Sequence, residues 1–188
     1  MRAFIAIELS PEIKDSLEQI QSHLKYSGAD VKWIEKDNIH LTLKFLGEID
    51  EKRLQYIKDI LDEIGKLSEP FEISLKDIGA FPKIDYPRVV WVGLDKGVAE
   101  SKILAEKIDE ALSKIGFDKK SRPFTAHLTL GRVRSSKNKD ALKEKILNCQ
   151  TSTVDYQLIG CVTLYRSTLT PEGSVYTKLH ETPFTRRP

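Results

Sequence analysis

The tetrapeptide His-Leu-Thr-Leu occurs twice, at residues 40–43 and at residues 127–130, and it holds the side chains best suited to proton transfer. Imidazole has an unperturbed pKa of about 6.5, so a histidine can give or take a proton near neutral pH. Displacement at phosphorus needs one group to remove a proton from the nucleophile and another to protonate the leaving oxygen. Two histidines and two threonine hydroxyls therefore suit in-line attack on a phosphate ester.

Both copies of the tetrapeptide lie in alternating runs that predict β-strands. In such a strand His40 and Thr42 share one face, as do His127 and Thr129, while the leucines lie on the opposite face. The leucines then pack in a core, and we expect the two histidines to face each other across a cleft. Cyclic phosphates of ribose fit this chemistry, because their strained ring is electrophilic without a metal ion.

The sequence favours one of three classes of function. A phosphoesterase is favoured because both histidines and both threonines are present. A catalytically idle protein that binds RNA ends or nucleotides is the alternative, and a turnover assay separates the two. A metal-dependent hydrolase is disfavoured, because no His/Asp/Glu cluster has the spacing of metal ligands. We therefore predict no metal ion and no cofactor.

The composition is that of a soluble globular protein. The 188 residues carry a formal net charge of +2, with 40% hydrophobic and 31% charged residues. No apolar run reaches the roughly 18 residues that a membrane helix needs, so we expect no association with a membrane. Cys149 and Cys161 fit neither a metal site nor a disulfide framework, which predicts a reduced, cytoplasmic protein.

A basic segment surrounds the second tetrapeptide. Residues 114–145 contain ten lysines and arginines against three acidic residues, a formal charge of +7, so the rest of the chain carries −5. This asymmetry is typical of a local site for a polyanion, although a solvated lysine-rich surface has the same pattern. The charge alone leaves both interpretations open.

The order of the helices and strands expected around these residues predicts an α+β fold. Ser10 and Pro11 start a helix that Gly28 ends, and Asp50 caps a second helix. Because two similar halves of mostly antiparallel strands follow each other without a linker, we expect one domain over residues 1–188. Further helices are expected at residues 98–115 and 140–147, and strands at residues 2–9, 31–34, 39–46, 71–81, 89–94, 124–133, 154–165 and 175–181.

Four longer runs around these motifs resemble one known family. They are Arg-Ala-Phe-Ile-Ala-Ile at residues 2–7, the run from Ile39 to Gly47, the run from Arg122 to Arg132, and the run from Tyr165 to Gly173. Together they resemble the 2H phosphoesterase superfamily, and within it the RNA 2′,3′-cyclic phosphodiesterases, also called 2′-5′ RNA ligases, of the LigT/ThpR type. The resemblance covers nearly the whole chain. One departure is Ala126, where many members have proline, and it removes no catalytic atom.

The resemblance implies two pseudo-symmetric lobes, each an antiparallel sheet with outer helices, that flank a central cleft. It implies that His40 is the proton donor, that His127 is the proton acceptor, and that Thr42 and Thr129 bind the phosphate. The implied reaction opens the 2′,3′-cyclic phosphate of an RNA end or a cyclic nucleotide and leaves a 2′-phosphomonoester. The resemblance also implies a ligase activity, which joins the cyclic phosphate to an RNA 5′-hydroxyl through a 2′-5′ bond. We expect a monomer.

Two cationic residues near the tetrapeptides are further candidates for phosphate binding. Lys44 shares the strand parity of His40, so we expect it at the phosphate or at the rim of the cleft. Arg132 has the opposite parity to His127, and it faces the cleft only if the strand is bulged there. Gly131 makes such a bulge possible.

Three residues are candidates for contacts with the rest of an RNA substrate. Arg134 is a candidate contact for the RNA backbone. Tyr165 and Phe81 are candidates for stacking on a base, which is how single-stranded RNA ends are held. Packing in the core or at the rim is the commoner role of such rings, and it stays open for both.

Overall fold

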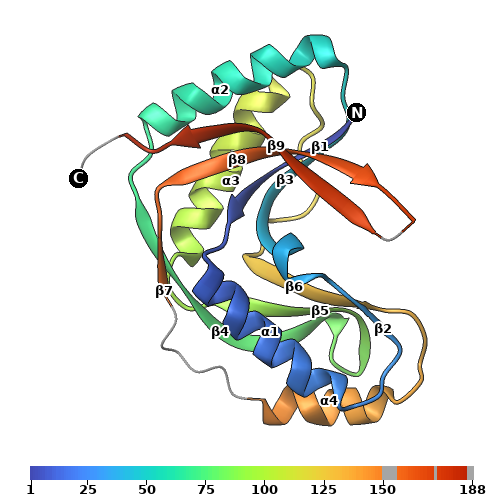
Figure 1. Cartoon of the computed structure of the whole chain (residues 1–188). Helices are drawn as coiled ribbons and strands as arrows, with labels where there is room; N and C mark the ends of the chain where they lie inside the picture. The colour runs from blue at the N-terminus through green and yellow to red at the C-terminus, as the bar shows by residue number, and fades with distance from the viewer. Residues whose placement is uncertain (150–155, 172, 186–188) are drawn as a thin grey trace.

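The structure of this chain, a computed structural model, describes residues 1–149, 156–171 and 173–185 (Figure 1). Short 3₁₀ helices at residues 36–38 and 51–53 precede β3 and α2. The strands are β1 (Arg2–Glu8), β2 (Val31–Trp33), β3 (His40–Glu48), β4 (Phe71–Lys83), β5 (Tyr86–Leu94), β6 (His127–Val133), β7 (Tyr156–Ile159), β8 (Cys161–Leu169) and β9 (Ser174–Pro183). The helices are α1 (Pro11–Lys25), α2 (Leu54–Lys66), α3 (Val98–Ser113) and α4 (Lys139–Asn148).

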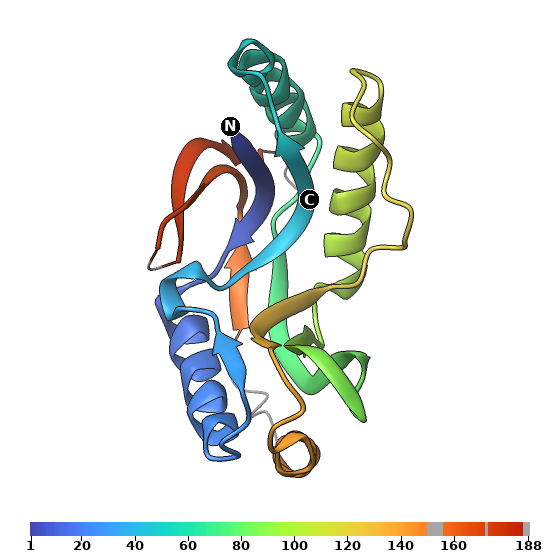
Figure 2. The same cartoon turned by 90° about the vertical axis from the view of Figure 1, so that its right-hand side faces the viewer.

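The strands form two antiparallel sheets, as the predicted α+β class requires. Sheet A has the strand order β3-β1-β8-β9, and sheet B has the order β2-β6-β5-β4-β7. Helices α2 and α3 lie against sheet A, and α1 and α4 lie against sheet B, so each sheet has helices on its outer side (Figures 1 and 2). The two lobes predicted from the family resemblance are these two layers of sheet and helix.

The halves of the chain exchange elements between the two lobes. Strand β4 comes from the first half but lies in sheet B, and β8 comes from the second half but lies in sheet A. Helix α1 follows β1 of sheet A yet packs on sheet B, and α3 follows β5 of sheet B yet packs on sheet A. One hydrophobic cluster consequently runs through both lobes, from Ile5 in β1 to Leu128 in β6.

Helix α1 illustrates how the local sequence produces this packing. The side-chain oxygen of Ser10 accepts a hydrogen bond from the backbone N–H of Ile13, and Pro11 occupies the first turn. The apolar side chains recur at helical spacing, and Ile13, Leu17 and Leu24 are all fully buried. The predicted cap and inner face of this helix are confirmed, and they bind it to the sheet of the other lobe.

Two strand predictions were wrong in their boundaries. The run predicted as one strand over residues 154–165 is two strands, because the chain passes from β7 in sheet B to β8 in sheet A at Gly160; residues 154 and 155 lie outside the described residues. The strand predicted over residues 124–133 begins only at His127. Its partner β5 ends at Leu94, beside Gly93 that pairs with His127, so residues 124–126 have no strand to pair with.

The inner face of α1 should carry much of the stability of the fold. Leu17 is fully buried, so we expect Leu17→Ala to lower the free energy of unfolding by about 2–5 kcal/mol, from lost burial and the cavity that remains. Urea unfolding followed by circular dichroism measures this change. The matched control is Leu147→Ala in α4, where the side chain is 62% exposed and the loss should stay within about 0.5 kcal/mol. Equal losses in the two variants would contradict this assignment of the core.

Candidate active site

Each tetrapeptide opens a strand, and the two strands lie beside each other although they belong to different sheets. His40 is the first residue of β3, and His127 is the first residue of β6. Strands β3 and β6 contact each other where the two lobes meet (Figure 2). All four leucines of the tetrapeptides are fully buried, whereas both histidines and both threonines are half-buried. In each sheet, we call the face that bears the histidine and threonine of its tetrapeptide the motif face.

The two imidazoles are held in the same way. The Nδ1 atom of His40 lies 2.8 Å from the carbonyl oxygen of Asn38, and Nδ1 of His127 lies 2.8 Å from the carbonyl oxygen of Thr125. A carbonyl oxygen can only accept a hydrogen bond, so Nδ1 must carry the proton in both rings. The Nε2 atom of each ring is therefore the one that gives or takes a proton.

Aromatic rings enclose His40 on the motif face of sheet A. The ring of Phe4 stacks on the imidazole with centroids 4.8 Å apart, and the ring of Tyr176 meets it edge-on at 5.3 Å. Tyr165 completes this group, with its ring centroid 5.2 Å from that of Phe4 and 6.5 Å from that of the imidazole. Tyr165 is only 8% exposed, which favours packing over stacking on a base, the two roles left open for its ring.

One aromatic ring contacts His127 on the motif face of sheet B, and a second ring packs behind the first. Phe81 meets the imidazole edge-on at 5.0 Å, and Trp91 lies 5.1 Å from Phe81. The indole covers Gly79, where an added Cβ would lie 2.3 Å from Trp91, so this close packing requires glycine. A pocket of about 310 Å³ opens beside these rings, and its lining includes Trp91, Gly93 and residues 124–126.

Each motif strand contains a β-bulge directly after its threonine. In β3, Thr42 lies opposite Ala6 but Lys44 lies opposite Ile5, so Leu43 is an extra residue. In β6 the register shifts in the same way after Thr129, and Leu130 is the extra residue. Because side chains alternate along a strand, one extra residue moves the side chains that follow it to the other face. In β3 this shift reaches Phe45, since a second extra residue, Leu46, lies between Phe45 and Gly47.

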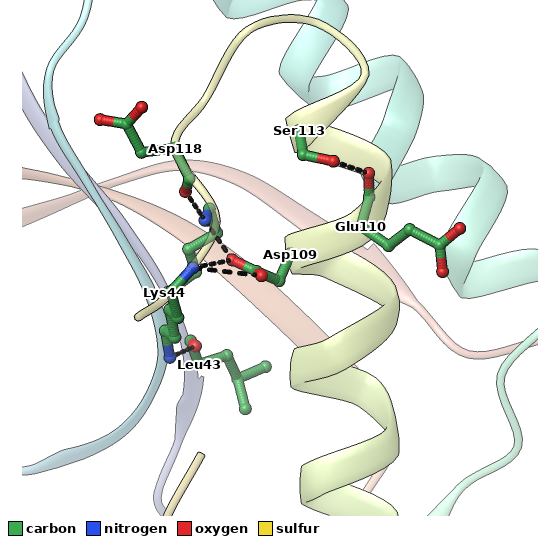
Figure 3. A network of polar contacts seen from close by, with 7 residues as sticks. Leu43, Lys44, Asp109, Glu110, Ser113 and Asp118 are labelled. Carbon is green, nitrogen blue, oxygen red and sulfur yellow. Dashed lines mark hydrogen bonds and ion pairs between the residues drawn. The ribbon is translucent and has the colours of Figure 1, made fainter. Parts of the chain in front are cut away.

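The bulge in β3 explains why the prediction for Lys44 was wrong. Lys44 does not share the face of His40 but is 2% exposed inside the protein. Its ammonium forms an ion pair with Asp109 of α3 and donates a hydrogen bond to the carbonyl oxygen of Asp118 at 2.8 Å (Figure 3). The side chain is therefore withdrawn from the phosphate site.

The same bulges bring two unlike residues to equivalent places on the motif face. Phe45 follows the bulge of β3, lies opposite Phe4, and is 68% exposed. Arg132 follows the bulge of β6 and is exposed, as expected if this strand is bulged. Strict alternation would place Phe45 on the core face with the leucines, so the sequence did not indicate Phe45 as a site residue. Phe4 and Tyr176 were also missed, since their nearness to His40 depends on how strands from opposite chain ends pair.

Arg134 lies beyond the end of β6. It is exposed, and its backbone N–H donates to the carbonyl oxygen of Asp30 at 2.8 Å. Its contact with the RNA backbone stays a prediction.

Within the described ranges, no group of three or more His, Cys, Asp or Glu side chains is arranged to hold a metal ion. No helix in this part of the chain is long and apolar enough to cross a membrane.

Comparison with known proteins identifies the family. A family model described as "LigT like Phosphoesterase" matches residues 7–91 and residues 93–176, and each range contains one tetrapeptide. The chain belongs to the LigT-like phosphoesterases. The prediction made from the four sequence runs is thereby confirmed.

Relatives of this LigT-like phosphoesterase match it over almost their whole length. It is 38% identical to the RNA 2′,3′-cyclic phosphodiesterase of Methanothermobacter thermautotrophicus, over 95% of this chain and 96% of that protein. It is 39% identical to the enzyme of the same name from Methanocaldococcus jannaschii, over 96% and 99%. The fold is also similar to the structure of E. coli LigT complexed with 3′-AMP, with a TM-score of 0.82 and 25% identity over 98% of this chain and 98% of that chain.

Burial lowers the basicity of both histidines in this LigT-like phosphoesterase. For His40, burial lowers the pKa to about 4, against the opposing effect of the Asn38 carbonyl and with a small further decrease from Lys14. For His127, burial also lowers the pKa; the Thr125 carbonyl opposes this, and the cations Lys120 and Arg132 add to it. Both rings are therefore neutral in the free protein at neutral pH.

We predict that neither histidine titrates at its usual pH in the free protein. In NMR spectra of ¹³C-histidine-labelled protein, His40 should titrate near pH 4 and His127 below pH 6.5. Inorganic phosphate should move both midpoints to higher pH, because an anion between the rings stabilises imidazolium. Single His→Ala variants assign the resonances. A midpoint above pH 7 for either ring without phosphate would contradict the proposed burial effect.

Proposed function

We propose that this protein hydrolyses the terminal 2′,3′-cyclic phosphate of RNA, and cyclic nucleotides, to a 2′-phosphomonoester. The observation that carries the proposal is the matched pair of imidazoles, each held through Nδ1 by a backbone carbonyl so that Nε2 is the reactive atom. Two relatives at 38% and 39% identity bear the name RNA 2′,3′-cyclic phosphodiesterase. The structure of E. coli LigT complexed with 3′-AMP supports a ribonucleotide with a phosphate on the ribose as ligand.

The proposed mechanism uses one proton transfer on each side of the phosphorus atom. His127 Nε2 takes a proton from water as the water oxygen bonds to phosphorus. The bond from phosphorus to O3′ breaks, and His40 Nε2 gives its proton to O3′. Thr42 and Thr129 donate hydrogen bonds to the non-bridging oxygens. The exposed guanidinium of Arg132 adds positive charge on the His127 side.

The lowered pKa of His40 gives the substrate a part in activating the enzyme. With a pKa of about 4, the His40 ring is neutral at pH 7, so its Nε2 atom carries no proton to give. The cyclic phosphate carries a negative charge, and a nearby anion raises the pKa of an imidazole. Substrate binding therefore promotes protonation of His40 at Nε2, whereas in the free protein His40 is neutral and cannot act as the acid.

Phe45 provides a surface for the nucleobase next to the phosphate. Its ring is 68% exposed on the same face as His40, which is unusual for a phenylalanine in a sheet. Stacking on an exposed ring holds bases without regard to their sequence. The exposed arginines 132 and 134 then extend the positive field along the RNA backbone.

Ligation through a 2′-5′ bond uses the same proposed residues in the same roles, with an RNA 5′-hydroxyl in place of water. His127 takes the proton of this hydroxyl as its oxygen bonds to phosphorus, and His40 protonates O3′ as the bond from phosphorus to O3′ breaks. We propose a monomer, because one chain supplies both histidines and both threonines and the proposed site needs no residue from a second copy. The two cysteines are free thiols, in keeping with a cytoplasmic protein.

We expect His40→Ala and His127→Ala each to lower kcat/KM for a 2′,3′-cyclic nucleotide by about 10²–10⁴-fold, because each removes one proton-transfer group. Thr42→Ala and Thr129→Ala should lose less, since each removes one hydroxyl donor. Chromatography of the product measures the rate and identifies the 2′-phosphate isomer. The control is His180→Ala, which removes an imidazole outside the two tetrapeptides. His180 Nε2 lies 2.6 Å from Oδ1 of Asp62 in α2. Near-normal turnover by His127→Ala would overturn the assignment, and an inactive parent protein would favour a nucleotide-binding protein.

A phosphodiester with a nitrophenolate leaving group separates the acid from the base. Nitrophenolate leaves without protonation, so we expect this substrate to restore much of the activity of His40→Ala. It should not restore His127→Ala, because the attacking water still needs a base. The reverse pattern, measured by nitrophenolate absorbance, would exchange the two roles.

Phe45→Ala should raise KM for a cyclic nucleotide by about tenfold, since stacking of a base on an aromatic ring contributes about 1–3 kcal/mol. Phe45→Trp should keep the parental KM because the stacking surface remains. The control substrate is ribose 2′,3′-cyclic phosphate without a base, for which Phe45→Ala should change nothing. An equal increase in KM for that substrate would show that Phe45 acts on the phosphate site instead.

A further inference from the structure

The buried lysine of β3 belongs to a network that connects the two motifs. The bulge in β3 turns Lys44 inward, where its ammonium meets Asp109 of α3 (Figure 3). The same ammonium donates to the carbonyl oxygen of Asp118, 2.8 Å away. Asp118 lies in the segment that leads from α3 to His127, so one lysine of the first motif strand holds the approach to the second.

Lys120 closes this network from the other side. Its backbone N–H donates to both carboxylate oxygens of Asp109 at 3.3 Å. Its ammonium reaches back to β3 and donates to the carbonyl oxygen of Leu43, the extra residue of the bulge. The ammonium also lies 5.2 Å from the ring centroid of Phe124. The segment is thus tied at residues 118 and 120 to the first motif, a few residues before His127.

The charged character of this network is hard to explain by stability. Burying an ion pair removes both charges from water, and an apolar pair of similar volume is often as stabilising or more so. A charged pair differs from an apolar pair in that its hydrogen bonds fix distance and direction. In this protein the network fixes β3, which carries His40 and Thr42, relative to the segment that precedes β6. That segment contains Thr125, and the carbonyl oxygen of Thr125 orients His127.

We propose that Lys44, Asp109 and Lys120 are positioning residues that set the place of the second motif relative to the first. None of the three touches the reacting atoms; they act through Leu43 in one direction and through the segment 118–126 in the other. The inference rests on the proposed function for its kinetic consequence. A displacement of about 1 Å between reacting groups can cost about 10²-fold in rate, so a device that fixes the two motifs has a large effect.

The test removes both members of the Lys44–Asp109 ion pair, so that neither of these two charges stays buried without the other. In the double variant Lys44→Met/Asp109→Leu, we expect an unfolding midpoint close to that of the parent and a kcat lower by about 10- to 100-fold, with KM within about threefold. The matched control is Glu72→Leu/Lys96→Met, which removes an exposed ion pair at β4 and should leave kcat within about twofold. A parental kcat in a folded Lys44→Met/Asp109→Leu protein would overturn the proposal.

The NMR titration of His127 gives a second measurement that does not need turnover. The cations near His127 are Lys120 and Arg132, and both oppose its protonation. Asp109 holds Lys120 in place through its backbone N–H. Without Asp109, the double variant should let Lys120 move away from His127 and so raise the pKa of His127, although the net charge of the protein is unchanged. Lys120→Met should raise it too, and Lys120→Arg should not. An unchanged His127 titration in the folded double variant would also overturn the proposal, even if the parent protein proves inactive on cyclic phosphates.

Discussion

The extra residue in each motif strand is the constraint on which the site depends. Without it, Lys44 would face the same side as His40, and Phe45 would be directed inward. With it, an ammonium goes into the protein while an aromatic ring and, in β6, a guanidinium come out onto the motif face. One irregularity, repeated in two strands, thus sorts the side chains that follow the threonines.

The carbonyl groups displaced by these bulges do not go unpaired. The carbonyl of Leu130 accepts two hydrogen bonds at 2.8 Å, one from the backbone N–H of Ile34 and one from the amide of Gln21 in α1, which is 2% exposed. Lys120 donates to the carbonyl of Leu43. Each donor comes from the half of the chain that does not contain the bulge it satisfies. A buried backbone carbonyl without a partner would be costly, so these contacts bind the halves to each other at the site itself.

How much of this could be read from the sequence depends on the range of the interactions. The strand face shared by His40 and Thr42 follows from local alternation, and the Ser10 cap follows from residues within one helical turn. The family followed from runs that surround the motifs. The position of Lys44 could not be predicted, because a bulge is a property of two paired strands. Gly131 hinted at the bulge in β6, but no glycine adjoins the bulge at Leu43 in β3.

The aromatic surroundings of the histidines were hidden for a similar reason. Phe4 and Tyr165 stack because β1 pairs with β8, two strands from opposite ends of the chain. The depth to which these rings bury His40 decides its pKa, so the electrostatics of the site also depend on long-range pairing. A sequence shows which residue can titrate, but the packing around it decides at what pH.

The exchange of β4 and β8 between the sheets has a consequence for the origin of the molecule. A polypeptide of only one half would end its sheet at an unpaired edge, and it could complete that sheet only by trading a strand with a second copy. Joining the two subunits of such a strand-exchanged dimer into one chain would give the present strand order. The place where β3 and β6 meet, with one histidine from each half, corresponds to the interface of that dimer.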